Sequence, residues 1–254
     1  MKSVAILLLA LAIPALVLGE FGYGKPRAPE ITAGPLVAGR SLDERAVPLT
    51  IGISNNYGAP MSIEFDHNAG GPEPIEGFLA PRQLGASSTT QFAFPTGWAG
   101  RINVGKTLNS ANSKIEASYV GSTDVDVSYV DGYSVPITCS AQGVAVAGCN
   151  IPLFNAGNTC DQVDNNGPVC INPKANVPEG PATPFFAPCQ GAAYTYPKDD
   201  DANLGGFGTL IDCCVGQSCP APARQQAKRN LEEREAGDVA GGAFERDHAR
   251  DLGR

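Results

Sequence analysis

The chain has 254 residues, of which 43% are hydrophobic and 17% charged, and this balance fits a globular core rather than a disordered polymer. Its 18 Lys and Arg stand against 26 Asp and Glu, a formal charge of −8 without a basic patch. Such an acidic chain is a poor partner for nucleic acid or for an anionic membrane surface. The chain also contains 30 Gly and 21 Pro, which makes it a poor candidate for a long helical bundle or a coiled coil.

The first 19 residues have the pattern of a secretory signal peptide. Lys2 gives the positive start, and the apolar run from Val4 to Leu18 is broken by Pro14. The run is too short to span a membrane. We therefore expect a secreted, extracellular protein without a membrane anchor. Association with the cell wall is compatible with this expectation. Residues 20–45 are predicted to be a flexible spacer or a pro-segment, either cleaved after Arg45 or left as an uncut linker.

The other end of the chain, residues 224–254, is predicted to be a disordered charged tail. It carries seven basic and seven acidic residues and few apolar ones, so it buries too little surface to offset the entropy of ordering. Arg and Glu pairs over 225–235 would support at most a frayed helix. Lys228 and Arg229 form a candidate dibasic cleavage site, with an ordinary solvated tail as the alternative.

Eight cysteines lie between the two ends, all of them after position 138. An even number behind a secretory signal predicts disulfides in an oxidising compartment. Zinc ligands would need a short C-x-x-C or His spacing, which the sequence lacks, so we expect no metal and no cofactor. The sequence leaves the pairing open among 105 possibilities. The cysteines are Cys139, Cys149, Cys160, Cys170, Cys189, Cys213, Cys214 and Cys219.

Between the signal and the cysteines, residues 46–138 contain short alternating runs typical of β-strands. These runs are Leu49–Ile53, Met61–Phe65, Thr89–Phe94, Lys114–Val120 and Asp124–Val130. Their parity predicts which face is buried. Ile115, Ala117 and Tyr119 should share a core face, as should Val125, Val127 and Tyr129. Lys114, Glu116 and Ser118, with Asp124, Asp126 and Ser128, should line an outer surface or a groove.

Residues 139–223 are rich in loops, and disulfides would compensate for the irregular structure. We expect one further strand pair here, at Ala192–Tyr196 and Thr209–Cys213.

Four segments of this region resemble motifs of the thaumatin-like proteins, in the family's order. Asp126–Pro136 resembles the segment D-[VI]-S-x-[VI]-D-G-[FY]-N-[VL]-P, and Pro95–Arg101 resembles P-x-x-W-x-G-R. Cys189–Asp200 is similar to C-P-x-A-Y-S-Y-x-x-D-D, and Leu49–Asn56 to the family's first strand and its turn. The chain has half of the family's usual sixteen cysteines, and Val104–Ser113 replaces a cysteine-rich loop. It is therefore similar to a reduced, divergent, fungal-type secreted member.

The resemblance implies an all-β fold: a thaumatin-like antiparallel β-sandwich with a disulfide-stabilised, loop-rich region, spanning residues 46–223. In this arrangement residues 46–138 and the terminal strands form the sandwich, and residues 139–219 form the cysteine-rich loops. It also implies a pairing of Cys149 with Cys189, and of Cys139 with Cys213 or Cys214. Cys160–Cys170 and Cys214–Cys219 would then close local loops.

The family's acidic cleft, carried over residue by residue, implies a site of five side chains: Arg101, Glu116, Asp126, Asp131 and Asp199. Crowded carboxylates raise one another's pKa, so Glu116 with Asp126 or Asp131 would be candidate catalytic residues for glycoside hydrolysis. They would alternatively bind sugar hydroxyls or cationic partners. The plain alternative is turn chemistry at Asp131 and a solvated strand face at Asp124 and Asp126.

The other conspicuous residues have simpler interpretations. Trp98 would stack on a sugar ring or, as we prefer, anchor the core. His67 and His248 lack further ligands, and Asp199–Asp201 lacks the Gly and Glu of a calcium loop.

The sequence thus predicts a monomeric binding protein that recognises cell-wall polysaccharide (β-1,3-glucan) or an extracellular protein through its acidic cleft. The first alternative is a weak endo-β-1,3-glucanase that uses the cleft carboxylates. The second is a secreted effector or structural protein with a vestigial cleft.

Overall fold

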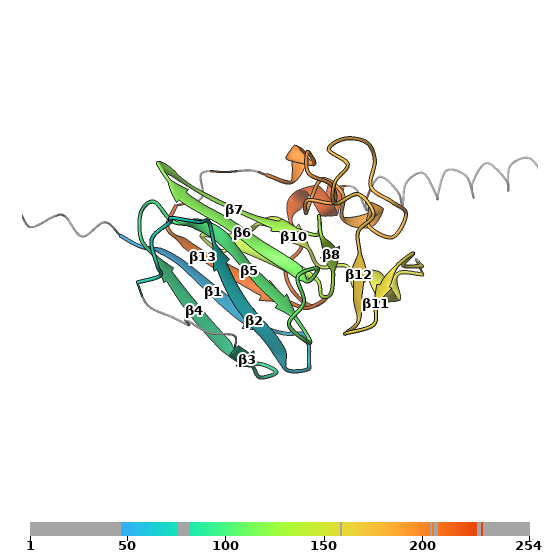
Figure 1. Cartoon of the computed structure of the whole chain (residues 1–254), viewed down its shortest axis with the longest axis horizontal. Helices are drawn as coiled ribbons and strands as arrows, with labels where there is room; N and C mark the ends of the chain where they lie inside the picture. The colour runs from blue at the N-terminus through green and yellow to red at the C-terminus, as the bar shows by residue number, and fades with distance from the viewer. Residues whose placement is uncertain are drawn as a thin grey trace, which may run out of the picture. The chain divides into compact units, whose positions relative to one another are not determined.

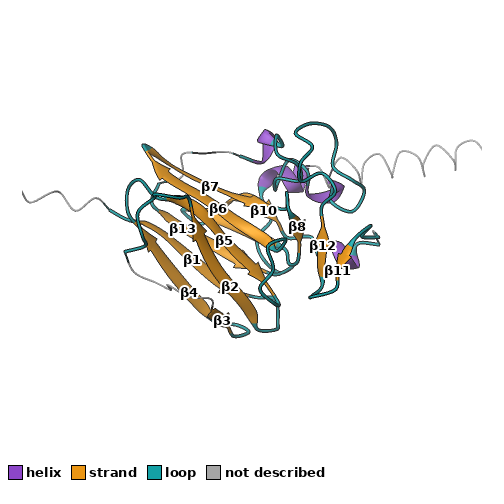
Figure 2. Cartoon of the chain, in the orientation of Figure 1, coloured by secondary structure: helices purple, strands orange, loops and turns teal. Residues whose placement is uncertain are grey.

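The computed structural model describes residues 47–75, 82–157, 159–203, 205, 208–227 and 230, and strands dominate it (Figures 1 and 2). Three short 3-10 helices are η1 (Leu153–Asn155), η2 (Ala187–Cys189) and η3 (Asp200–Ala202). The strands are β1 (Leu49–Asn55), β2 (Met61–His67), β3 (Arg82–Leu84), β4 (Thr89–Phe94), β5 (Ala99–Gly105), β6 (Ser113–Val120), β7 (Ser122–Ser128), β8 (Gly132–Tyr133), β9 (Ile137–Ala141), β10 (Val144–Cys149), β11 (Val163–Asp164), β12 (Val169–Ile171) and β13 (Leu210–Val215).

The long strands form two five-stranded sheets. One has the order β10-β9-β13-β1-β4, the other has the order β3-β2-β5-β6-β7, and β11, β12 and β8 make a small third sheet. In Figure 1, strands β2, β5 and β6 lie in front of β1 and β13. The predicted antiparallel arrangement fails at one pair, because β1 and β13 run parallel from Thr50↔Leu210 to Asn55↔Val215. Strands β2 to β12 lie between these two strands in sequence, so the chain has ample length to return in the direction of β1.

Side chains from both five-stranded sheets share one hydrophobic core. Ile115, Val125 and Val127 come from the second sheet and Ile51 and Ile211 from the first, and all five are fully buried. Their alternation with polar neighbours follows the period of two of a strand. The core faces predicted from parity are therefore confirmed for β6 and β7. On the opposite face Glu116, Ser118, Asp124 and Asp126 are partly exposed, whereas Lys114 and Ser128, predicted to line a surface or groove, are buried.

Four disulfides brace the loop-rich half. They join Cys139 to Cys213, Cys149 to Cys189, Cys160 to Cys170 and Cys214 to Cys219. Cys139 lies directly opposite Cys213 in the β9–β13 ladder, which decides between the two partners that the resemblance left open. No helix among the described residues is long and apolar enough to cross a membrane. The disulfides fit an extracellular or secreted protein.

One of the two predicted late strands is absent. Ala192–Tyr196 forms only isolated bridges, at Ser128↔Tyr194 and Gln190↔Ala193, whereas β13 pairs with β1 and β9. The turn at Gly191, with a φ of +77°, helps to interrupt regular extension here. The predicted signal peptide (residues 1–19) and spacer (residues 20–45) lie outside the described residues.

The tail predicted to be disordered from residue 224 has ordered structure at its start. Residues 223–227 are helical, and Gln225 is only 2% exposed. The Gln225 Nε2 atom donates to Asn150 Oδ1 at 2.8 Å, and its Oε1 atom accepts from the Asn150 backbone N–H at 3.3 Å. Arg224 also donates to the Asp201 carbonyl. Ordered structure therefore extends past residue 224; apart from Asn230, the tail from residue 228 onward lies outside the described residues.

We expect Gln225→Ala to lower the free energy of unfolding by about 1–2 kcal/mol, because it leaves the Asn150 amide groups without their partners. Urea unfolding followed by tryptophan fluorescence would measure the change. Gln226→Ala, in the same helical turn but exposed, is the matched control and should have little effect. Equal effects of the two changes would contradict a specific role for Gln225.

Candidate functional site

Four polar side chains lie in register across the outer face of the second sheet. Arg101 on β5 is opposite both Asp66 on β2 and Glu116 on β6, and Glu116 is opposite Asp126 on β7. Residues directly opposite one another in a ladder project from the same face, with Cβ atoms about 4.5–5.5 Å apart. Asp66, Arg101, Glu116 and Asp126 therefore form a continuous polar row across four strands.

The polar row lines a hollow of about 510 Å³, here called the main groove, which also includes His67 and Asp124. This volume lies within the range of small-molecule sites. Gly100 allows β5 to lie tightly against β2, because a Cβ there would collide with the Asp66 carbonyl and the Trp98 ring. That close approach sets Arg101 beside Asp66.

The electrostatics of the main groove centre on Asp126. Burial raises the pKa of its carboxyl, the Glu116 and Asp124 carboxylates add to the effect, and the pKa reaches about 8. The Asp126 Oδ1 atom is inaccessible to solvent and has no hydrogen-bond partner in the described part of the chain. At neutral pH Asp126 is mostly protonated, so it can donate a hydrogen bond where its ionised neighbours only accept.

Arg101 and Asp66 form an ion pair at the groove's β2 side, with Arg101 Nη2 2.9 Å from Asp66 Oδ2. About half of each side chain is exposed, so this pair contributes little to stability and can exchange water for a ligand. Next to it, His67 Nε2 lies 3.2 Å from Glu73 Oε1. The backbone carbonyl of Asn68 raises the pKa of His67, with further contributions from Glu73 and Asp66.

Residues from the loop-rich half border the β7 side of the main groove. Asn203 Nδ2 donates to Asp124 Oδ2 at 2.9 Å. The backbone of Tyr194 exchanges hydrogen bonds with Val127 and Tyr129, each 2.8 Å long. Burial raises the pKa of Tyr194 to about 12, and the negative charges of Asp126, Asp200 and Asp124 act in the same direction. Its hydroxyl therefore stays protonated beside the carboxylates.

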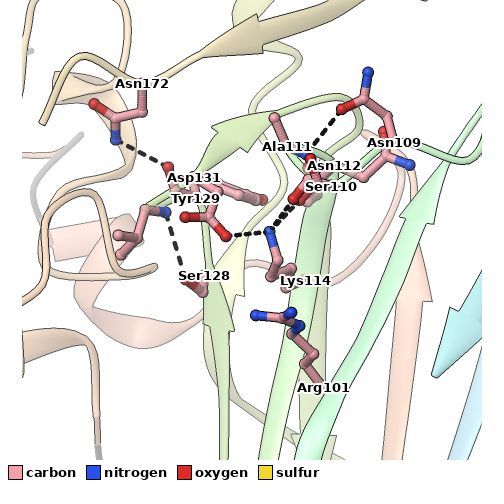
Figure 3. Close-up of polar contacts among 12 residues, drawn as sticks. Arg101, Asn109, Ser110, Ala111, Asn112, Lys114, Ser128, Tyr129, Asp131 and Asn172 are labelled. Carbon is pink, nitrogen blue, oxygen red and sulfur yellow. Dashed lines mark hydrogen bonds and ion pairs between the residues drawn. The ribbon is translucent and has the colours of Figure 1, made fainter. Parts of the chain in front are cut away.

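Asp131 does not join the main groove. Its Oδ2 atom lies 2.7 Å from Nζ of Lys114, a lysine whose side chain is only 3% exposed (Figure 3). Lys114 also donates to the Ser110 carbonyl at 2.7 Å and to the Asn112 carbonyl at 3.3 Å. The Asp131 carboxylate thus pairs with a buried ammonium. The sequence had suggested only hydrogen bonds within a turn for this residue.

Asp199 is also outside the main groove. The prediction that it lines the cleft with Arg101, Glu116 and Asp126 is therefore wrong. Asp199 is 2% exposed, and its carboxylate accepts from the backbone N–H groups of Gly191 and Thr195 and from the Thr195 hydroxyl, the last at 2.7 Å. Burial raises its pKa, whereas the hydrogen bonds from Thr195 and Gly191 lower it. Asp199 therefore organises its own loop.

Of the five predicted site residues, the structure brings together Arg101, Glu116 and Asp126. Sequence reasoning missed Asp66, which continues the alternation of β2. It placed Lys114 on the face of Glu116 but did not predict its burial or its pairing with Asp131. Trp98 is fully buried and stacks on Phe94 with ring centroids 3.8 Å apart, so it is a core anchor.

Comparisons with known proteins add no assignment: no family model matches the sequence, and no curated protein matches it. Within the described ranges, no group of three or more His, Cys, Asp or Glu is placed to hold a metal ion.

Proposed function

We propose that the chain is a secreted thaumatin-like β-sandwich whose main groove binds a neutral cell-wall polysaccharide, β-1,3-glucan, without converting it. Two five-stranded sheets around one core, and disulfides that join the cysteines as the resemblance implies, support the family. The polar row supports the binding site.

The observation that carries the proposal is the alternation of donors and acceptors along the polar row. Arg101 and protonated Asp126 donate, while Asp66 and Glu116 accept. Sugar hydroxyls both donate and accept, so successive hydroxyls of a neutral chain can match this order. A groove lined mainly by polar groups, with four acidic side chains among them, is poorly suited to an apolar ligand or to an anion.

The test uses the full secreted chain mixed with insoluble β-1,3-glucan, with bound protein and released reducing sugar both measured. We expect binding without sugar release. The double variant Glu116→Gln/Asp126→Asn should lose roughly tenfold or more in affinity, because a hydrogen bond to a charged group is lost at the centre of the row. The matched double variant Glu179→Gln/Asp161→Asn, at exposed carboxylates outside the groove, should bind normally.

A hydrolytic function is the second candidate, and the pair Glu116 and Asp126 favours it. A protonated carboxyl beside an ionised one is the arrangement of a general acid with its nucleophile or base. Release of reducing sugar by the parent chain, lost in Glu116→Gln/Asp126→Asn, would replace binding by hydrolysis as the function. Neither binding nor release would favour a secreted effector or structural protein.

A further inference from the structure

A second hollow adjoins the main groove on the other side of the Arg101–Asp66 pair. It has a volume of about 400 Å³ and lies between β2, β5 and the loop of residues 106–112. Arg101 and Asp66 line both hollows, so their ion pair lies between the main groove and the second hollow. Glu64, Asn103, Leu108 and Ser110 line the second hollow beyond it.

The loop that walls the second hollow is held in place by several contacts. Lys114 binds the Ser110 carbonyl, as Figure 3 shows. Asn109 uses both ends of its side-chain amide: Nδ2 donates to Asp164 Oδ2 at 3.0 Å, and Oδ1 accepts from the Ala111 N–H at 2.8 Å. Because the wall is ordered before any ligand arrives, binding here costs little conformational entropy.

Asn103 lines the second hollow, and its side-chain carbonyl is a hydrogen-bond acceptor without a partner in the described chain. The residue is 8% exposed, and its Oδ1 atom has no partner among the described residues. Its ladder neighbours on the same face are Glu64, which only accepts when ionised, and Lys114. The three protons of the Lys114 ammonium are already matched by Asp131, Ser110 and Asn112. Asn103 Oδ1 is therefore a buried acceptor without a donor among the described residues, and it makes the floor of the second hollow polar.

We propose that the ligand is an extended, neutral hydroxyl-bearing chain that crosses the Arg101–Asp66 pair and fills both hollows. A hydroxyl of the second segment would donate to the Glu64 carboxylate beside Asn103, and Leu108, 44% exposed, would contact the apolar face of a sugar ring. The Arg101–Asp66 pair, half exposed, would bind the linkage between the segments. This inference rests on the proposed function and adds that affinity depends on chain length.

The experiment titrates the full chain with soluble β-1,3-linked glucose oligomers of two to about eight units. Calorimetry gives the affinities, and amide chemical shifts show which hollow responds. We expect the disaccharide to perturb main-groove residues alone, and longer oligomers also to perturb Leu108, Asn109 and Ser110. Affinity should rise by about tenfold, the equivalent of roughly one good hydrogen bond, and then level off once both hollows are filled.

Two variants separate the hollows. Ser110→Trp places a bulky ring in the second hollow, so it should reduce the affinity of the long oligomers to that of the disaccharide and leave disaccharide binding unchanged. Lys106→Trp, in the same exposed loop but outside the hollow, is the control and should change neither affinity. Length-independent affinity, with shifts confined to the main groove, would overturn the second hollow's role. Failure of every oligomer to bind would contradict the proposed function itself.

Discussion

Replacing Asp126 by Asn should stabilise the folded protein at pH 8–9 by several kcal/mol and leave its stability near pH 4 almost unchanged. The reason is the cost of ionising this carboxyl inside the fold. Burial, with Glu116 and Asp124 nearby, raises its pKa from 3.8 to about 8. At about 1.4 kcal/mol per pH unit, this rise corresponds to on the order of 5 kcal/mol, as an upper figure.

The sign follows from the protons bound in each state. Between about pH 4 and pH 8 the folded protein holds a proton on Asp126 that the unfolded chain has released. The free energy of unfolding therefore falls as the pH rises through this range, and the Asp126 contribution is constant above it. Asn is neutral at every pH and has nearly the same size as Asp. The free energy of unfolding of Asp126→Asn should therefore lack the decline that Asp126 causes.

Urea denaturation of the parent chain and of Asp126→Asn, at intervals from pH 4 to pH 9, measures the difference directly. Asp161→Asn removes an exposed carboxylate and is the matched control. Glu116→Gln should end the decline at a lower pH and make it smaller, because it removes one of the two charges that raise the Asp126 pKa in the folded protein. Parallel profiles for the parent and Asp126→Asn would mean that Asp126 is already ionised in the folded state.

The strands and their faces were accessible to sequence reasoning because burial follows a period of two. The run Thr89–Phe94 is β4, and Val125, Val127 and Tyr129 are fully buried as their alternation predicts. The same parity places Glu116 and Asp126 on one outer face, and it requires only that β6 and β7 are neighbours. The groove's central pair is thus the part of the site that local patterns can predict.

The contributions of Asp66, Lys114 and Asp131 depend on long-range pairing that no local pattern contains. Asp66 meets Arg101 only because β2 pairs with β5, 35 residues later in the chain. Lys114 and Asp131 are brought together where the turn after β7 passes the start of β6. A motif gives the position of Asp131 along the chain, but the partner of its carboxylate is set by which cation the fold buries beside it.

Asp199 shows the same limit within a single motif. The resemblance of the segment Cys189–Asp200 had implied that Asp199 faces a cleft, yet the chain turns so that its carboxylate points back to Gly191 and Thr195. By accepting hydrogen bonds from two backbone N–H groups, the Asp199 side chain holds the conformation of its own loop. Its replacement should consequently affect folding far more than ligand binding.

We expect Asp199→Ala to lower the free energy of unfolding by roughly 3 kcal/mol or more. The change leaves two backbone N–H groups and one hydroxyl without an acceptor, and each buried unsatisfied group costs about 1–3 kcal/mol. Asp199→Asn keeps one side-chain oxygen as an acceptor and nearly the same shape, so its loss should be smaller. Thermal and urea unfolding of both variants would measure these values.

Glucan binding at a temperature where both variants remain folded separates the structural role from a role in the groove. Asp199→Asn should bind β-1,3-glucan as the parent chain does, whereas Glu116→Gln/Asp126→Asn should not. If Asp199→Asn keeps its stability but loses binding, the carboxylate contacts the ligand after all, and the loop must open to let it do so. Because Asp199 is 2% exposed and its oxygens already accept from Gly191 and Thr195, such an opening would cost those hydrogen bonds. The structure therefore favours a loss of stability with binding retained.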